Sequence, residues 1–533
     1  MTHVLDGIEP STRATRREWW GLAVLALPCI LYSMDFTVLH LAVPAMTAAL
    51  RPSSTQLLWI IDSYGFLLAG ALIAMGVLGD RIGRRRLLLI GSTIFGLVSV
   101  LAAVAPTAEL LIAARALLGL AAATMAPSTL SLIRNMFLDP KQRRVAIGIW
   151  VASFSAGAAL GPVIGGALLS VFWWGSVFLV AVPVMVVLLI VGPKLLPEYR
   201  DDHPGRIDLT SAALSSTAIV ALVFGIKEFA TAGPTGAAVL AALTGVVLAA
   251  LFVRRQQTLS VPFIDLKLFR SAPFATMFVV YLLVFVVNFS AFFYISQDLQ
   301  ILLGLSPMQA GLWTLPWAVS FIAGSFAGPA LAKRIRPTFV VASGLAVAGA
   351  GFVVVTLAAA HSSLGLFVLG SVVFPLGLAP GIALITDLIV GSAPPKRAGM
   401  ASGLSEAGAE LGGALGIALI GSAATFAYRR DLAPIADRLP NDAATAARDT
   451  IGSALTTAQH LAAPVGNELV TAATAAFAYA SVLAFTLCAL ASLIGSLLAG
   501  FVGRTKPAAG TTESTDVPCV DGSDDPPSAR VEP

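Results

Sequence analysis

The sequence predicts an all-α polytopic membrane protein. Three observations lead to this fold class. The 533 residues are 57% hydrophobic and only 12% charged, about half the charged fraction of an ordinary soluble domain. Apolar runs long enough to cross a bilayer recur along the chain, and arginine and lysine gather in alternate segments between them. A protein core cannot take up so much apolar surface, so lipid must surround most of the chain.

Fourteen apolar runs are long enough to span a bilayer, which takes about 20 residues. They are residues 21–45, 55–79, 87–105, 108–133, 145–170, 174–193, 208–226, 235–253, 273–297, 307–332, 338–360, 364–391, 398–427 and 472–503. The first run has no small-residue cleavage site at a suitable distance, so the N-terminus is not a signal peptide.

The positive charges predict the orientation of these spans. An even number of spans places both termini on one side of the membrane. If that side is the cytoplasm, 26 of the 33 lysines and arginines lie inside, six lie outside and one, Arg115, lies within a span. This asymmetry follows the positive-inside rule. We therefore expect a multi-pass protein of the cytoplasmic (cell) membrane with both termini in the cytoplasm.

Outside the spans, little of the sequence indicates chemistry. The loop 428–471 is alanine-rich with dispersed charges, which predicts one or two amphipathic surface helices. The tails are residues 1–20 and 504–533, and the second is polar, proline-rich and expected to be disordered. Scattered cysteines and histidines, no P-loop and no basic aromatic stripe indicate no metal, no cofactor, no enzyme activity and no nucleic-acid partner.

The fifth span carries the most informative motif. Its small residues and proline follow a regular spacing: Gly148, Gly157, Gly161, Pro162, Gly165 and Gly166. Glycines four apart share a helix face and let another backbone approach closely, and Pro162 predicts a bend. A tightly packed helix with no other role is the alternative. The spacing resembles the antiporter motif of the major facilitator superfamily, G-x8-G-x3-GP-x2-GG, with every position filled.

Two further motifs carry the same resemblance. The loop after span 55–79 contains Gly76, Gly79, Asp80, Arg81, Gly83 and Arg84. Positive-inside signalling explains its arginines but not its glycines or its aspartate. The loop resembles the superfamily's signature G-x-L-[GA]-D-R-x-G-R-[RK]. This resemblance implies that Asp80 pairs with an arginine or caps a helix and so acts as a latch that holds the cytoplasmic side closed.

Arg115 is the basic residue within the fourth span. An arginine there costs about 2.5 kcal/mol or more, so it should face a polar partner or water. Snorkelling to the outer interface is the alternative. Its spacing from Gly119 resembles the superfamily's R-x3-G motif, which favours a buried role.

With fourteen spans, these motifs resemble the fourteen-helix drug:proton antiporters, which include quaternary-ammonium exporters, over residues 15–503. The resemblance implies two six-helix bundles related by a pseudo-twofold axis, 21–206 and 255–503, with an inserted helix pair at 207–254. It implies proton-coupled export of hydrophobic, cationic drugs or toxic metabolites by alternating access. The partners would be a small hydrophobic substrate, protons and membrane lipids, and we expect a monomer.

Four membrane-embedded acids are candidates for coupling or cation recognition: Asp35, Asp62, Glu406 and Glu410. An acid in such a site can exchange a proton for a cationic substrate. Asp35 could instead serve only helix–helix hydrogen bonding, and an interfacial polar role for Asp62 is equally supported. The two glutamates are four apart and would repel unless one is protonated or a cation is near. Span 307–332 lacks the acid that some relatives carry, which leaves the charge preference of the substrate open.

Aromatic side chains could cage a lipophilic cation, although packing or interface roles are more usual in spans. The candidates are Tyr64, Trp150, Tyr281, Phe285, Phe292, Trp313 and Trp317. Two alternatives to drug efflux stay open: export of a membrane lipid or self-made antibiotic, and a sensor or assembly protein that transports nothing.

Overall fold

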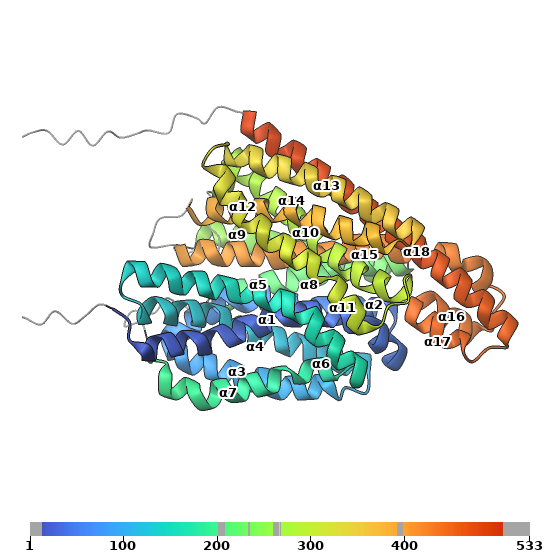
Figure 1. The fold of residues 1–533 in the computed structure, drawn as a ribbon, viewed down its shortest axis with the longest axis horizontal. Helices are drawn as coiled ribbons and strands as arrows, with labels where there is room; N and C mark the ends of the chain where they lie inside the picture. The colour runs from blue at the N-terminus through green and yellow to red at the C-terminus, as the bar shows by residue number, and fades with distance from the viewer. Residues whose placement is uncertain are drawn as a thin grey trace, which may run out of the picture.

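The computed structural model describes residues 13–200, 208–232, 235–259, 266, 268–391 and 398–504, and this part of the chain is helical (Figure 1). Its α-helices are α1 Arg16–Leu50, α2 Ser54–Ile82, α3 Arg84–Ala103, α4 Ala108–Met136, α5 Pro140–Val171, α6 Ser176–Leu179, α7 Ala181–Leu195, α8 Leu209–Ala232, α9 Gly236–Thr258, α10 Ala272–Ile301, α11 Pro307–Trp313, α12 Leu315–Ala332, α13 Pro337–His361, α14 Leu364–Gly391, α15 Ala398–Ala436, α16 Asn441–Asp449, α17 Ile451–Ala458 and α18 Ala463–Arg504. A single 3₁₀ turn, η1 Leu268–Arg270, precedes α10.

Polar residues mark where these helices begin. Thr15 accepts a hydrogen bond from the backbone at the start of α1, and Glu18 closes the capping box. Ser53 and Gln56 do the same for α2. Such caps satisfy amide groups that have no partner within the helix. The sequence therefore sets helix starts locally, while lipid requires the backbone between them to bond internally.

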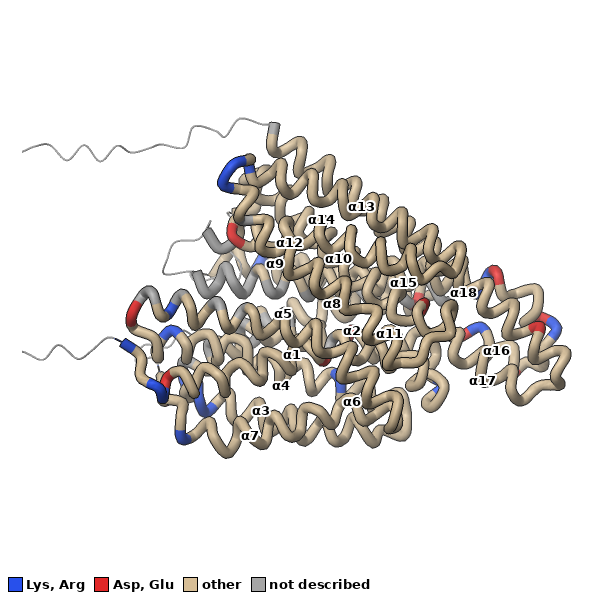
Figure 2. Tube along the Cα trace, in the orientation of Figure 1, with Lys and Arg blue, Asp and Glu red and all other residues tan. Residues whose placement is uncertain are grey.

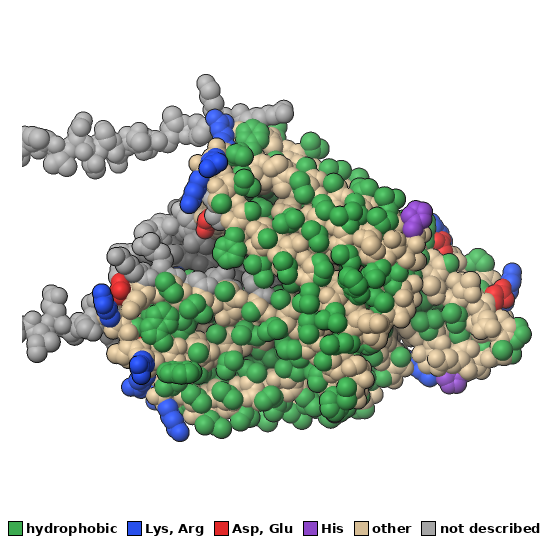
Figure 3. Space-filling view, in the orientation of Figure 1, with side chains coloured by type: hydrophobic (Ala, Val, Ile, Leu, Met, Phe, Trp, Pro, Cys, Tyr) green, Lys and Arg blue, Asp and Glu red, His purple; other side chains and the backbone are tan. Residues whose placement is uncertain are grey.

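Twelve of the described helices are long and apolar enough to cross a membrane. A thirteenth is α1, if its segments Arg16–Asp35 and Thr37–Leu50, bent by 42°, form one span. The remaining expected span, 208–226, falls in α8, whose apolar part Ala213–Ile226 is shorter. The count of fourteen therefore stays a prediction. Charged residues gather at the two ends of the molecule (Figure 2), and hydrophobic side chains cover its flank (Figure 3).

The helices pack in two groups with a pair between them. Helices α1 to α7 pack mainly on one another, and so do α10 and α12 to α18, whereas α11 packs mainly on α5 of the first group. The pair α8–α9 packs on itself, and α8 also touches α2 of one group and α15 of the other. At one side of this pair, the Arg255 guanidinium binds the Asp208 carboxylate at 2.8 Å. Burial opposes the charged form of Asp208, but hydrogen bonds from Arg255 and Ser211 outweigh burial and hold its pKa below the usual range.

The two ends of the molecule differ. We call the end where α1 begins and α18 finishes the tail end, and the end that carries α16 and α17 the cap end (Figure 1). The loop 428–471 was expected to hold one or two surface helices, and α16 and α17 lie there. The helices extend beyond the expected span limits of 427 and 472, since α15 runs on to Ala436 and α18 begins at Ala463. The added turns pack on α16 and α17, so helix continues after the apolar run ends.

Candidate functional site

A buried ion pair lies at the centre of the first helical group. The Arg115 side chain on α4 is fully buried, and its Nη1 donates to Oδ2 of Asp35 on α1 at 2.5 Å. Its Nε donates to the carbonyl oxygen of Ile60 on α2 at 3.1 Å. The guanidinium carbon also lies 4.5 Å from the centroid of the Tyr64 ring. Arg115 thus contacts α1 and α2 in the protein interior, and the snorkelling alternative is wrong.

The spacing of Arg115 and Gly119 has a steric reason. A Cβ atom at Gly119 would lie 2.1 Å from the carbonyl oxygen of Tyr64. Only glycine lets α4 approach α2 this closely, and that approach brings the guanidinium one turn away over the Tyr64 ring. The Asp35 side chain keeps 12% of its surface exposed. The pair therefore joins a fully buried cation to an acid whose side chain is partly exposed.

The glycine spacing of α5 faces the helix that carries Asp35. A Cβ atom would lie 2.1 Å from the Ile30 carbonyl oxygen at Gly157, 1.9 Å from Thr37 Oγ1 at Gly161, and 3.2 Å from a Val38 methyl carbon at Gly165. The predicted close approach is present, and its partner is α1. No space remains for a side chain along this contact.

No break interrupts α5, which runs from Pro140 to Val171, so the bend expected at Pro162 stays a prediction. A sharp bend lies in α1, between Asp35 and Thr37. The Thr37 hydroxyl donates to the Met34 carbonyl oxygen at 3.1 Å, and such bonds bend helices. Pro162 serves a contact, since a Cβ atom at Gly311 of α11 would lie 2.1 Å from its carbonyl oxygen. Gly166 meets the same helix, with Pro307 O 2.7 Å from its added Cβ.

A second glycine stripe, missed in the sequence, mirrors the first. A Cβ atom at Gly412 of α15 would lie 2.8 Å from the Leu282 carbonyl oxygen of α10, and one at Gly416 would lie 2.4 Å from that of Val286. Gly408 meets the Phe278 ring one turn earlier. The spacing of four was readable in the sequence, but no motif drew attention to it. Each helical group therefore contains one helix pair in backbone contact.

Some predicted residues lie outside what the structure describes. The backbones of Glu406 and Glu410 belong to α15, on either side of Gly408, but their side chains are not among the described ones. The Asp80 side chain is likewise not among the described ones. Gly148 is described only by its place in α5. Asp62 is described, and its side chain is buried in α2.

The loop between α2 and α3 is tied to the segment after α7. Gly83 adopts φ 109°, a conformation that suits glycine. The Arg84 backbone amide donates to Tyr199 O at 2.9 Å, and Arg85 binds the Glu198 carboxylate at 3.5 Å. The Arg84 side chain is buried against Gly79, whose added Cβ would lie 3.0 Å from it. Glu198 was not predicted, because nothing local in the sequence marks it as a partner. Gly76 and Arg81 lie in α2, at the tail end.

The aromatic candidates fall into separate groups. Tyr64 lies 6.4 Å from Tyr32, and Tyr32 continues through Phe154 to Trp150, a row that reaches the ion pair. Tyr281 and Phe285 contact each other on α10, with the Tyr281 hydroxyl 2.9 Å from that of Ser405. The third group is Phe292 and Trp317, 4.9 Å apart. Trp313 is 40% exposed, unlike the other six, and joins none of these rows.

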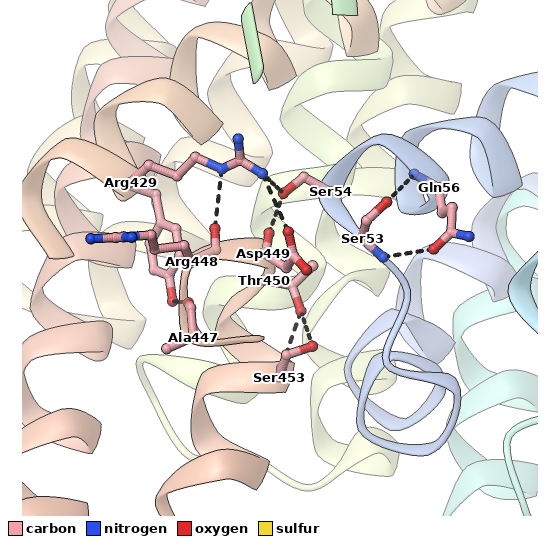
Figure 4. A network of polar contacts seen from close by, with 10 residues as sticks. Ser53, Ser54, Gln56, Arg429, Ala447, Arg448, Asp449, Thr450 and Ser453 are labelled. Carbon is pink, nitrogen blue, oxygen red and sulfur yellow. Dashed lines mark hydrogen bonds and ion pairs between the residues drawn. The ribbon is translucent and has the colours of Figure 1, made fainter. Parts of the chain in front are cut away.

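At the cap end, a polar network joins the helical groups (Figure 4). Arg429 of α15 binds the Asp449 carboxylate at 3.3 Å and Arg448 O at 3.2 Å, and it also donates to Ser54 of α2 at 3.2 Å. The Ser54 hydroxyl donates to the Asp449 carbonyl oxygen. Nearby, Gly452 of α17 meets Thr47 of α1. The network connects segments far apart in sequence, so sequence patterns alone did not indicate it.

Comparison with known proteins decides the family. Residues 25–417 match the Major Facilitator Superfamily. The chain belongs to this superfamily. It is therefore a multi-pass membrane transporter and not an enzyme.

Its relatives include named export and resistance proteins. It is 44% identical to the multidrug efflux pump LfrA of Mycolicibacterium smegmatis, over 90% of this chain and 94% of that one. It is 35% identical to the methyl viologen resistance protein SmvA of Salmonella typhimurium, over 86% and 93%. The tetracenomycin C resistance and export protein of Streptomyces glaucescens is 30% identical over 96% of both chains.

Among solved structures, a bacterial homologue of the human lysosomal transporter Spinster matches with a TM-score of 0.65, at 18% identity, over 93% of this chain and all of that one. This likeness shows the superfamily fold.

Proposed function

We propose that the chain exports hydrophobic, cationic drugs or toxic metabolites in exchange for protons. The observation that carries this proposal is the Asp35–Arg115 pair, a partly exposed acid beside a fully buried cation. Two relatives support a hydrophobic, cationic substrate: one is named for multidrug efflux and the other for resistance to methyl viologen, which is a dication. Transport runs on the proton gradient, with alternating access between the two helical groups.

The pair has a simple exchange chemistry. When Asp35 takes a proton, its bond to Arg115 weakens, and Arg115 keeps the Ile60 carbonyl and the Tyr64 ring as partners. When Asp35 loses the proton, it is free to pair a cation, either Arg115 or the substrate. Asp35 lies at the bend of α1, on the helix that slides against the glycine face of α5. Proton loading and helix movement therefore share one element.

The positive-inside charge bias supports a cytoplasmic tail end and an outward cap end. On this assignment, residues 21–206 and 255–503 form the two bundles, and residues 207–254 are the inserted pair. The Asp80 latch, the Glu406–Glu410 pair and the buried Asp62 are assigned to gating and coupling within the same scheme, and the protein acts as a monomer.

Removing the charge of Asp35 without changing its shape tests the proposal. In everted membrane vesicles with an imposed pH gradient, Asp35→Asn is expected to lower ethidium transport to about a tenth of wild type or less, because the neutral amide cannot take up or release a proton. Asp437→Asn, at an exposed acid of the cap end, is the matched control and should transport normally. Full transport by Asp35→Asn at normal expression contradicts the proposal.

Export of a self-made antibiotic is the second candidate. The observation that favours it is the relative named for tetracenomycin C export, which aligns over 96% of this chain. A matched set of neutral polycyclic and cationic substrates separates the two. Transport of the neutral set alone supports the second candidate.

A further inference from the structure

A second buried acid lies away from the Asp35 pair. Asp298 is in the last turn of α10, at the cap end, and is fully buried. Its Oδ1 accepts a hydrogen bond from the Ser481 hydroxyl of α18 at 2.7 Å. Its Oδ2 is buried with no hydrogen-bond partner in the described part of the chain. An ionised carboxylate in such a place is costly, whereas a protonated one is tolerated.

The groups around Asp298 supply no permanent positive charge. On its own helix, Tyr294 lies one turn earlier on the same face. Cys488 of α18 interacts with Tyr294, and Tyr428 of α15 lines a small cavity together with Tyr294. His40 of α1 accepts a hydrogen bond from Ser296 through its carbonyl oxygen, and all three residues are buried. The ion pairs of the described residues include none of these groups. A proton is the cation that suits this site.

Asp298 lies where α10 of the second helical group meets α1 of the first, a contact that we call the joint. On either side of it, the Ser296 hydroxyl donates to His40 O of α1 at 3.3 Å, and the Gln300 amide donates to Leu41 O of α1 at 3.1 Å. One face of this turn of α10 thus binds the first helical group, and Asp298 binds α18 in the second. Alternating access requires the α1–α10 bonds to break.

A small cavity lies next to this position, on the side of the cap end. It holds about 60 Å³ and is lined by Tyr294 and Gln297 of α10, Ala480 of α18, Ser54 of α2, and Asp449 and Thr450 of the cap. Gln297 precedes Asp298 in the chain, and Ala480 precedes Ser481. The cavity is polar on its cap side and has room for a few water molecules. Its walls come from both helical groups, so it widens when they part.

We propose that Asp298 is a proton-binding site separate from the Asp35 pair, reached from the cap end through this cavity. A proton delivered by cavity water binds Oδ2, and the carboxylate becomes a neutral acid that still accepts the Ser481 hydrogen bond on Oδ1. The joint closes around this neutral form. When the joint opens, water enters, and the acid releases its proton to that water. The proposal rests on the proposed function only for the use of protons as the driving ion.

The first experiment detects the proton itself. In purified full-length protein, infrared difference spectra between neutral and alkaline pH should show the carbonyl stretch of a protonated carboxylic acid, shifted by isotope-labelled aspartate. The band should be missing in Asp298→Asn and should change frequency in Ser481→Ala, which loses the hydrogen bond but keeps the acid. A band that is the same in wild type and both variants overturns the proposal, whether or not the protein transports.

The second experiment measures coupling in proteoliposomes with ethidium as the probe. Asp298→Asn is expected to keep ethidium–ethidium exchange within about twofold of wild type and to lower gradient-driven transport to about a tenth or less. Asp437→Asn should match wild type in both assays. Gradient-driven transport by Asp298→Asn with the wild-type pH profile overturns the proposal. If Asp298→Asn does not fold, the Ser481→Ala variant provides the test. An unchanged infrared band together with an unchanged pH profile in Ser481→Ala also overturns the proposal.

Discussion

At the scale of single residues, three acids of this transporter illustrate three environments. Asp35 is partly exposed and pairs with a buried arginine. Asp298 is fully buried and has a serine as its hydrogen-bond partner. Asp449, on the cap, is half-buried beside Arg429.

Asp449 gives a pH prediction, since burial raises its pKa and Arg429 offsets only part of that effect. With the cap closed, the carboxyl binds a proton more tightly than it does in water. Its contribution to the closed cap is therefore fully present below the ordinary pKa of about 4 and is lost as the pH rises through the raised value. Thermal unfolding from about pH 4 upward should show wild type losing more stability than Asp449→Asn. Parallel pH profiles for the two proteins would rule this out.

At the scale of elements, two helix pairs are in backbone contact: α5 on α1 through Gly157 and its neighbours, and α15 on α10 through Gly416 and its neighbours. Each glycine face presents no side chain of its own, so it can slide along its partner helix but cannot accept added bulk. Helix α1 opens the first helical group and α10 opens the second, and a pseudo-twofold relation between the groups stays a prediction.

Even one methyl group should therefore be harmful at these positions. Gly157→Ala would place a Cβ 2.1 Å from the Ile30 carbonyl oxygen, and Gly416→Ala would place one 2.4 Å from that of Val286. We expect both variants to insert in the membrane but to lose most of their transport, because the helices must separate. Gly365→Ala, where an added Cβ has nothing within 4 Å, is the control and should behave as wild type. Ethidium transport normalised to the amount of membrane protein is the measurement, and normal rates in both stripe variants would refute the sliding contact.

At the scale of the whole molecule, the cap end holds the helical groups together. Arg429, Asp449 and Ser54 connect α15, α16 and α2 (Figure 4). Gln300 and Ser296 bind α10 to α1. Transport by alternating access needs these contacts to break and re-form in each cycle.

A reversible cross-link at the cap end tests this requirement. A Cβ atom at Gly452 would lie 2.9 Å from Cβ of Thr47, so cysteines at both positions need only about 1 Å of adjustment to form a disulfide. In a variant whose three native cysteines are replaced by alanine, oxidation of the Thr47→Cys, Gly452→Cys pair should stop transport, and reduction should restore it. Each single variant is a control. Continued transport by the fully oxidised pair would show that the cap end does not open.

Local patterns in the sequence determined the fold class, most helix positions and the motifs. Hydropathy and charge alternation act within about 20 residues, so Arg115, Gly157 and Gly83 could be singled out from their neighbours alone. The sequence also marked Asp35 correctly as a deeply placed acid, although it did not reveal its partner.

Only the tertiary structure decided which residues meet. The partner of Arg115 lies 80 positions earlier in the chain, and Ser481 lies 183 positions after Asp298. Asp298 was missed because it follows the expected end of an apolar run, where an acid resembles an ordinary boundary residue. Its burial arises from α18, which no local pattern places beside α10. Hydropathy is a property of a segment, whereas pairing and burial are properties of packing between segments.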